Sequence, residues 1–325
     1  SGPIRMSDPL LAARMRSNAG SFGLNSSRSQ ALLGLEQNLS ATGNDLTSDL
    51  AELFGRFAEL VESPKDLNTR EATLATARDL AGTIRRHDSE LNRSRTDANA
   101  RIRDLASDAN TLAVDLARLN KMIQTSQDPI LQDKRDFTAL KLSEIVGGSS
   151  RIDPDGHMRF VMDSGAVLVD GNLASTLETT PDAALGNLYK LELVHGNTRH
   201  DITTSVDGGK IGGELKFRDT DSVASISALD QLAFDLATKF NAGHRANFAL
   251  DGATTTVNFF NEPLVVAGAA AAFDLDAAIT AERISLGGVA GAPGDNTGGI
   301  TLLAQRDDAT LAGGGTRTYF DESIQ

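Results

Sequence analysis

The side chains best suited to metal binding in this sequence gather between positions 192 and 201. Four of them supply two imidazoles and two carboxylates, ligands that Zn²⁺ accepts: Glu192, His195, His200 and Asp201. Their spacing matches no standard ligand pattern, and a β segment would send alternate side chains to opposite faces. Solvated residues at strand ends explain them better, so we predict no metal site and no other cofactor.

Two glycine-rich segments, at 208–213 and 287–294, invite comparison with phosphate-binding loops. Neither places Gly-Lys-Ser/Thr at the start of a helix, and neither contains Gly-x-Gly-x-x-Gly inside a strand-helix-strand unit. Turns and hairpin ends explain both segments better. No Gly-x-Ser-x-Gly element occurs and no Ser, His and Asp set stands out, so the sequence predicts no enzyme.

The composition excludes further classes. The chain has 325 residues and no cysteine, which removes disulfides, thiolate metal sites and thiol nucleophiles together. Its 31 Lys and Arg against 44 Asp and Glu give a net charge of −13, and no basic cluster offers phosphate contacts, so nucleic acid is not expected as a partner. No stretch approaches the ~18 apolar residues of a membrane span, and the first residues lack the apolar core of a secretory signal.

The sequence predicts mainly helices in the first half of the chain. Leu and Phe recur at three- and four-residue steps across 31–61, with Gly43 and Asn44 in the middle, which indicates two amphipathic helices or one interrupted helix. Ser63 and Pro64 then predict an N-cap and a first-turn proline for a new helix.

A longer periodicity follows over 67–123, where positions at alternating three- and four-residue steps would form one seam along a helix. Most of these seam positions are apolar. An unbroken helix here would be about 85 Å long at ~1.5 Å per residue, longer than a compact domain needs. Arg70, Asp88 and Arg95 interrupt the seam and are expected to weaken it locally, and a break near Gly82 stays open. We expect the leucines at 105, 112, 116 and 119 to form core within the chain.

Pro129 ends this helix, and a further helix is predicted over 130–146. It carries a run of charges that includes Asp133, Arg135 and Asp136. These three are our candidate interface residues, although a helix surface with local ion pairs explains them more simply.

After residue 148 the sequence changes to short segments with β character, separated by turn signals. The predicted strands lie at 158–162, 166–169, 189–194 and 214–217. The helical period returns over 226–240, and the part from 259 onward has only weak strand or hairpin signals.

This order predicts an α+β fold: an elongated helical bundle or coiled-coil-like rod with an inserted, mainly antiparallel β domain. We expect the first part of the helical domain over 7–148, the β domain over 149–220, and the return to the helical domain, with short hairpins, over 221–325. Residues 1–6 begin with Ser1-Gly2, which is typical of a cloning scar.

Several short segments stand in a recognisable order. They are Leu53-Phe54-Gly55-Arg56-Phe57, Ser63-Pro64, Leu116-Ala117-Arg118-Leu119-Asn120, a Leu-x-Asp-x-Arg-Asp element over 131–136, and Phe259-Phe260. Together they resemble the family of the flagellar hook-associated protein FlgK. The resemblance extends over most of the chain and is weakest in the β domain.

The resemblance implies an extracellular structural component of the bacterial flagellum that joins hook to filament through subunit packing, without catalysis. It implies export by the flagellar type III apparatus without a cleaved signal peptide, and hook protein and the second junction protein as partners. Residues 1–6 would include the exit from an N-terminal assembly helix. Both terminal assembly helices are expected to be missing, and with them self-association in a ring and the binding of an export chaperone through the C-terminal helix.

Two other interpretations stay open. An extracellular adhesive or binding module would recognise its ligand with the β domain and use the helices as a stalk. Another axial flagellar protein, the second junction protein or flagellin, would share the arrangement of helices around a β insertion. The Leu-x-Asp-x-Arg-Asp element and the Phe-Phe pair favour the FlgK family over these.

Overall fold

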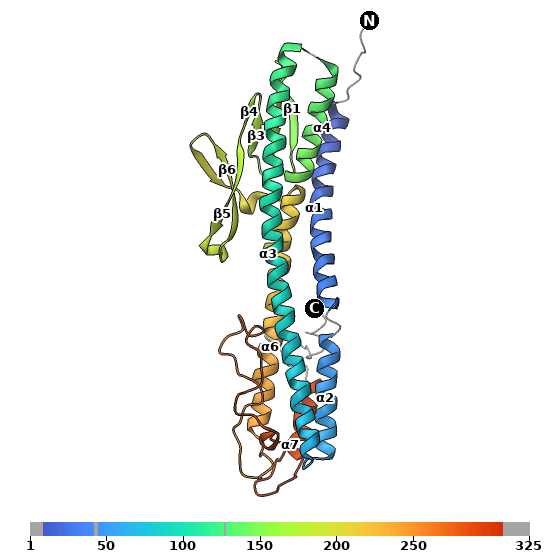
Figure 1. The fold of residues 1–325 in the computed structure, drawn as a ribbon, viewed down its shortest axis with the longest axis vertical. Helices are drawn as coiled ribbons and strands as arrows, with labels where there is room; N and C mark the ends of the chain where they lie inside the picture. The colour runs from blue at the N-terminus through green and yellow to red at the C-terminus, as the bar shows by residue number, and fades with distance from the viewer. Residues whose placement is uncertain (1–8, 42–44, 127, 308–325) are drawn as a thin grey trace. The chain divides into compact units, whose positions relative to one another are not determined.

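The computed structural model describes residues 9–41, 45–126 and 128–307. The chain forms two compact units (Figure 1). The first is built from the chain up to Glu36 and from Arg93 to Ser222, and the second from Gln37 to Asn92 and from Val223 onward. Helices dominate and two small antiparallel sheets are inserted among them, so the predicted α+β class is confirmed.

The helices of the first unit come from distant parts of the sequence. They are α1 (Pro9–Ala41) as far as Glu36, α3 (Leu67–Ser126) from Arg93, α4 (Pro129–Val146) and α5 (Gly209–Lys216), which continues through a π-helical turn over Phe217–Asp221. The helix predicted over 130–146 is confirmed. Asp128 caps α4, because its carboxylate accepts the backbone N–H of Ile130 at 2.9 Å.

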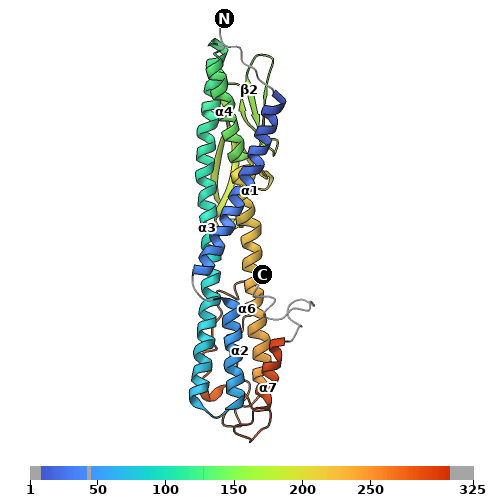
Figure 2. The same ribbon diagram turned by 90° about the vertical axis from the view of Figure 1, so that its right-hand side faces the viewer.

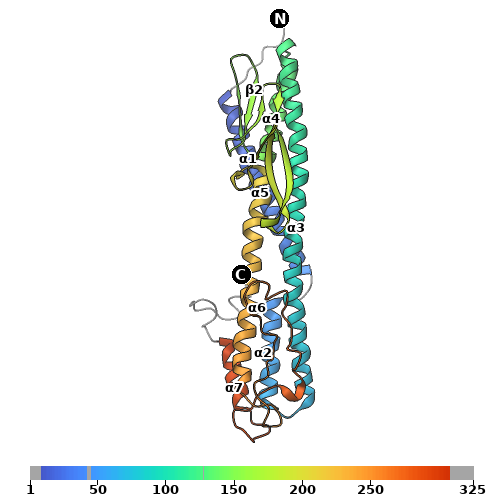
Figure 3. The same cartoon turned by 90° about the vertical axis from the view of Figure 1, so that its left-hand side faces the viewer.

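Both sheets belong to the first unit. One contains β1 (Ser149–Ile152), β2 (Met158–Val161), β3 (Val167–Asp170) and β4 (Leu173–Ala174), and the other β5 (Thr176–Asp182), β6 (Leu188–His195) and β7 (Thr198–Asp201). All pairings join consecutive antiparallel strands. In Figure 1, β5 and β6 lie on one side of α3, and α1 and α4 lie on the other; the same sheet faces the viewer in Figure 3.

The strand predicted over 214–217 is wrong, since this segment completes α5 and enters the π-helical turn. Glu214, Leu215, Lys216 and Phe217 alternate locally like a strand. However, Leu215 lies one helical turn after Ile211, and both are buried in the core of the first unit. Tertiary packing therefore overrides the local alternation.

The core of the first unit joins α3 and α4 to the inner faces of the sheets. Its fully buried members include Ile102, Leu116, Leu142, Phe160 and Leu168. Leu116 and Leu119 are buried, and Leu105 and Leu112 pack against the core, as predicted for core within the chain.

Three asparagines of α3, which we call the asparagine ladder, hold the strands by their main chain. Asn99 accepts the backbone N–H of Tyr189 in β6 at 2.8 Å. Asn110 both accepts from and donates to the backbone of Leu177 in β5, at 2.7 and 2.8 Å. Asn120 does the same with Met158 in β2, at 3.0 and 2.8 Å.

The second unit contains α2 (Leu46–Glu62), α3 up to Asn92, α6 (Ser222–Arg245) from Val223, and α7 (Thr297–Ala304), which run alongside one another (Figure 2). The chain between α6 and α7 is irregular. Weak strand or hairpin signals were predicted from 259 onward, and among the residues described up to 307 two isolated bridges join this part, Phe248 with Gly287 and Phe260 with Leu275.

Aromatic rings fill the core of the second unit. Phe57 of α2 lies 5.0 Å from Phe240 of α6, measured between ring centroids, and both contact Phe259 at 5.3 and 5.1 Å. Phe260 packs edge-on against Phe259 at 4.8 Å. These offset contacts are the arrangements that aromatic pairs prefer.

The residues predicted to start α3 have another role. Ser63 is the C-cap of α2, where its N–H donates to the carbonyl of Glu59, and α3 begins at Leu67. Asp66 supplies the cap instead, by accepting the N–H of Asn68 at 3.0 Å. The prediction of a Ser63 cap is therefore wrong. α3 continues through Gly82 without a break.

Candidate interface on helix α4

Helix α4 presents apolar side chains on two opposite sides. Ala139 and Leu142 are buried in the core of the first unit. Ile130 and Phe137, seven residues apart and therefore nearly two helical turns along one line, are 65% and 60% exposed. Nζ of Lys141 lies 5.6 Å from the centroid of the Phe137 ring, within the range of a cation–π contact.

We call Ile130, Asp133, Lys134, Phe137 and Lys141 the α4 outer face. All five side chains are exposed. Large exposed apolar side chains bordered by charges are typical of protein-binding surfaces.

The structure separates the three predicted interface residues. Asp133 is exposed and belongs to the α4 outer face. Arg135 points inward: it is 3% exposed, and its Nη1 donates to the carbonyl of Gly156, in the turn between β1 and β2, at 2.9 Å. Asp136 is partly exposed, with Oδ1 3.8 Å from Nε of Arg135. Sequence spacing did not reveal which charge faces inward.

Helix α1 supports α4 from the inner side by close backbone approach. A methyl group at Gly23 would overlap the carbonyl oxygen of Glu144, and one at Gly20 would lie 3.3 Å from the carbonyl of Ser143. Burial lowers the pKa of Arg16 in α1, while the charge of Asp136 acts in the opposite direction. α4 therefore packs closely against α1 on the side away from its outer face.

The residues considered for metal binding are engaged elsewhere. Glu192 accepts a hydrogen bond from Thr180 at 2.8 Å and pairs with Lys190 at 3.0 Å, and these contacts lower its pKa. His195 contacts the hydroxyl of Ser175, and His200 stands opposite Leu193 in the sheet. Within the described ranges, no group of three or more metal-ligating side chains is found.

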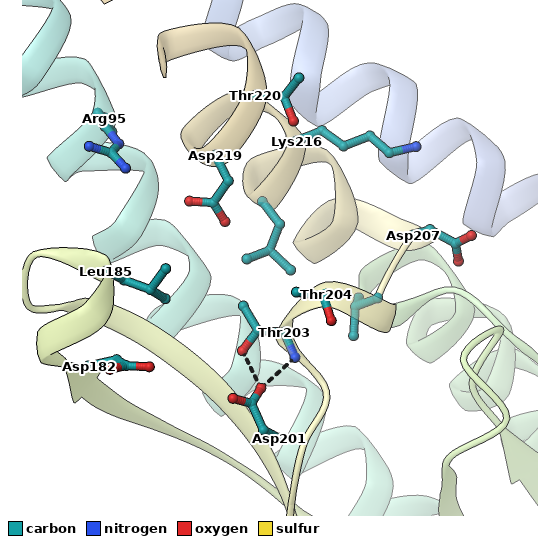
Figure 4. Close-up of a pocket in the computed structure, with 12 residues that line it drawn as sticks. Arg95, Asp182, Leu185, Asp201, Thr203, Thr204, Asp207, Lys216, Asp219 and Thr220 are labelled. Atoms are coloured by element: carbon teal, nitrogen blue, oxygen red, sulfur yellow. Dashed lines mark hydrogen bonds between the residues drawn. The ribbon is translucent and has the colours of Figure 1, made fainter. Parts of the chain in front are cut away.

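A cleft of about 570 Å³ lies between the second sheet, α3 and α5 in the first unit (Figure 4). Its polar groups serve the local structure. Asp201 accepts hydrogen bonds from the backbone and hydroxyl of Thr203, at 2.9 and 2.7 Å. Asp219 pairs with the buried Arg218 at 2.7 Å, and Arg95 donates to the carbonyl of Arg218. The lining residues include no serine, cysteine or histidine, and the contact of Thr203 with Asp201 closes a local turn two residues long.

Buried polar groups in the second unit are also structural. Arg70 is 1% exposed and donates to the carbonyls of Pro64, Ala281 and Ile284 at 2.7, 2.8 and 2.9 Å. Burial lowers the pKa of Arg70 to about 10, so the guanidinium stays charged at neutral pH. The expected weak point in the seam is thus a site of attachment for the irregular segment.

Among the helices within 9–41, 45–126 and 128–307, none combines the length and the apolar character that crossing a membrane demands.

Helices around two small inserted antiparallel sheets, with a partly apolar helix face exposed to solvent, define the class of an α+β helical-bundle protein. Residues 32–260 match the model of the "flagellar hook-associated protein FlgK helical domain". This match covers more than half of the chain, and the chain belongs to that family.

The chain is also similar to two hook-associated proteins and to one solved structure. It is 26% identical over 262 residues to flagellar hook-associated protein 1 of Escherichia coli K12, covering 78% of this chain and 48% of the relative. The corresponding protein of Salmonella typhimurium LT2 is 26% identical over 264 residues, covering 78% and 47%. The structure of the flagellar hook junction protein FlgK from Burkholderia pseudomallei shares the fold, with a TM-score of 0.66, 21% identity, and coverage of 78% and 46%. The chain spans about half the length of these relatives.

Proposed function

We propose that this chain is a structural part of the bacterial flagellum at the junction between hook and filament, on the extracellular side. The observation that carries the proposal is membership of the FlgK helical-domain family over 32–260. The names of the relatives, hook-associated protein 1 and hook junction protein, support the same location.

Hook protein and the second junction protein are the proposed partners. For the full-length protein we further propose self-association in a ring through terminal helices, binding of an export chaperone through a C-terminal helix, and export without a cleaved signal peptide.

Within this chain, we propose the α4 outer face as a contact with a neighbouring flagellar subunit. Its support is the exposure of Ile130 and Phe137 beside Asp133. Asp136 stands at the edge of this surface. Arg135 contributes indirectly, because its bond to Gly156 holds the turn against α4.

The test is sedimentation velocity of the full-length protein with hook protein, compared between wild type and Phe137→Asp or Asp133→Lys. We expect both variants to weaken co-sedimentation at least tenfold. Asp97→Lys, an exposed charge change on α3 of the same unit, is the matched control and should leave it unchanged.

Unimpaired association of both variants would contradict the role of the α4 outer face. If the full-length protein does not associate with hook protein, while the 325-residue chain binds a surface ligand, the adhesive interpretation replaces the junction.

A further inference from the structure

The cleft of the first unit has an apolar floor between two walls of different charge (Figure 4). Val206 and Leu215 line it and are themselves buried, and Leu185 adds a third apolar side chain at the end of the β5–β6 hairpin. The cleft volume of about 570 Å³ lies within the ~300–1,000 Å³ that is usual for binding pockets. The cleft is therefore large enough to receive more than one side chain.

The charged groups of the lining divide between the two walls. The wall supplied by the chain from 182 to 207 carries three carboxylates and no cation: Asp182, Asp201 and Asp207. The wall supplied by α3, α5 and the π-helical turn carries Arg95, Lys216 and Asp219. Asp219 is already paired with Arg218 at 2.7 Å, which leaves this second wall positive.

The α4 outer face has the matching order of side chains. Its apolar members, Ile130 and Phe137, lie within about 20° of each other around the helix axis, at ~100° per residue. Lys134 and Lys141 lie about 40–60° to one side of Phe137, and Asp133 lies about 40° to the other side. An apolar line is therefore bordered by positive charge on one side and by negative charge on the other.

The spacing of these side chains is typical of a helix that docks in a groove. Positions 130, 134, 137 and 141 repeat at steps of four, three and four, the spacing by which amphipathic helices place their anchors. Complementary charges on both sides of the anchors fix the orientation of such a helix.

The cleft and the α4 outer face are directed to different sides of the first unit. In Figure 1, β5 and β6 lie on one side of α3, and α4 lies on the other. The α4 outer face also points away from the core, because Ala139 and Leu142 on the opposite side of α4 are buried there. One copy can therefore offer its cleft to one neighbour and its α4 outer face to another, as a contact that repeats requires.

We propose that the cleft receives the α4 outer face of a second copy of this chain. Phe137 lies over the apolar floor, the two lysines face the carboxylate wall, and Asp133 faces Arg95 and Lys216. The inference rests on the proposed function, because it names the neighbour of the α4 outer face. The contact is heterologous, so it closes into a ring or continues as an open row. One helix face in one cleft is a small interface, so each contact is reversible and gains strength from repetition.

Cross-linking tests the contact directly, because the chain contains no cysteine. Thr138→Cys lies beside the lysines of α4, and Thr204→Cys lies in the lining of the cleft. A short bismaleimide should join the two variants when they are mixed and should leave each alone monomeric. A chain with both substitutions should give dimers, trimers and longer species. Val114→Cys mixed with Thr204→Cys controls for random collision, since Val114 is 60% exposed on α3 and belongs to neither surface.

Charge reversal tests the orientation of α4 in the cleft. Lys134→Glu combined with Lys141→Glu should lower the yield of mixed cross-links at least tenfold, because like charges then meet at the carboxylate wall. Asp182→Lys and Asp207→Lys, introduced into the copy that carries Thr204→Cys, should restore the yield. Melting curves by circular dichroism verify that each variant is folded.

Yields equal to the control at about 1 mM chain, where a contact with a Kd of about 1 mM is roughly half formed, would overturn the second copy as the occupant. So would a reversed cleft that fails to restore the reversed helix face. The proposed function survives either result if Phe137→Asp still weakens co-sedimentation with hook protein, because α4 then contacts a different subunit. If Phe137→Asp changes neither cross-linking nor co-sedimentation, the inference and the role of the α4 outer face both fail.

Discussion

Ser285 donates its backbone N–H to Nε2 of His244 over 2.8 Å, in the core of the second unit. Because Nε2 accepts this bond, the neutral ring carries its proton on Nδ1, which donates to the carbonyl of Val257 at 2.7 Å. Burial lowers the pKa of His244 to about 4. His244 is therefore a fixed neutral group that joins α6 to two parts of the irregular segment.

This burial predicts a loss of stability in mild acid. The unfolded chain binds a proton at His244 near pH 6.5, and the folded chain only near pH 4. The contribution of His244 is thus fully present above pH 6.5 and declines as the pH falls toward 4, by roughly 3 kcal/mol in the free energy of unfolding. Urea unfolding at several pH values measures it.

The matched variants for this experiment are His244→Gln and His200→Gln. Glutamine cannot gain the proton, so His244→Gln should lose less stability between pH 7 and 4 than the wild type, even though it starts lower. His200 is exposed, and its replacement should preserve the wild-type slope. Equal slopes for all three proteins would contradict the assignment.

Arg70→Met should destabilise the second unit by roughly 3 kcal/mol, since three buried carbonyls lose their shared donor. Arg78→Met, on an exposed part of α3, should change stability by less than about 0.5 kcal/mol. Thermal and urea unfolding report both. A near-neutral Arg70→Met would show that water or backbone movement replaces the guanidinium.

Two glycines of α1 should respond to alanine in opposite directions. Gly23→Ala forces a methyl group against the carbonyl of Glu144 and should cost about 1–3 kcal/mol. Gly34→Ala meets nothing within 4 Å and should stabilise the helix by about 0.5–1 kcal/mol. Denaturant midpoints of the two variants measure the difference, and a destabilised Gly34→Ala would refute the open space at that position.

Substitutions of Arg135 and Asp133 should differ in their effect on stability, because Arg135 is buried and Asp133 lies on the α4 outer face. Arg135→Met removes a buried donor to Gly156 and should lower the free energy of unfolding by about 1–3 kcal/mol. Asp133→Ala should change it by less than about 0.5 kcal/mol. Unfolding midpoints distinguish them; an equally large loss for Asp133→Ala would place its carboxylate in a structural contact.

The apolar period predicts the helices wherever they bury a continuous seam, as α2, α3, α4 and most of α6 do. It does not reveal the first half of α1, because Gly20 and Gly23 weaken the local helical signal while serving the tight contact with α4.

The strands that escape prediction are the polar ones. β7 is exposed along its whole length, and β5 contains threonine, glutamate and aspartate, so neither shows a clear apolar alternation. For the α4 outer face, the sequence identifies the charged run, but the inward turn of Arg135 depends on where the carbonyl of Gly156 lies after folding.

The asparagine ladder of α3 has a consequence for how freely the sheets can vary. Each asparagine bonds to backbone atoms of its strand, at Tyr189, Leu177 and Met158, so attachment does not specify a strand side chain. Residues at outward-facing positions of the hairpins can therefore be substituted while the hydrogen bonds from the asparagine ladder to the strand backbone are kept. The attachment of the hairpins to α3 therefore tolerates different side chains on the strands. We expect the solvent-exposed surface of the hairpins to vary in sequence more readily than the rest of the first unit.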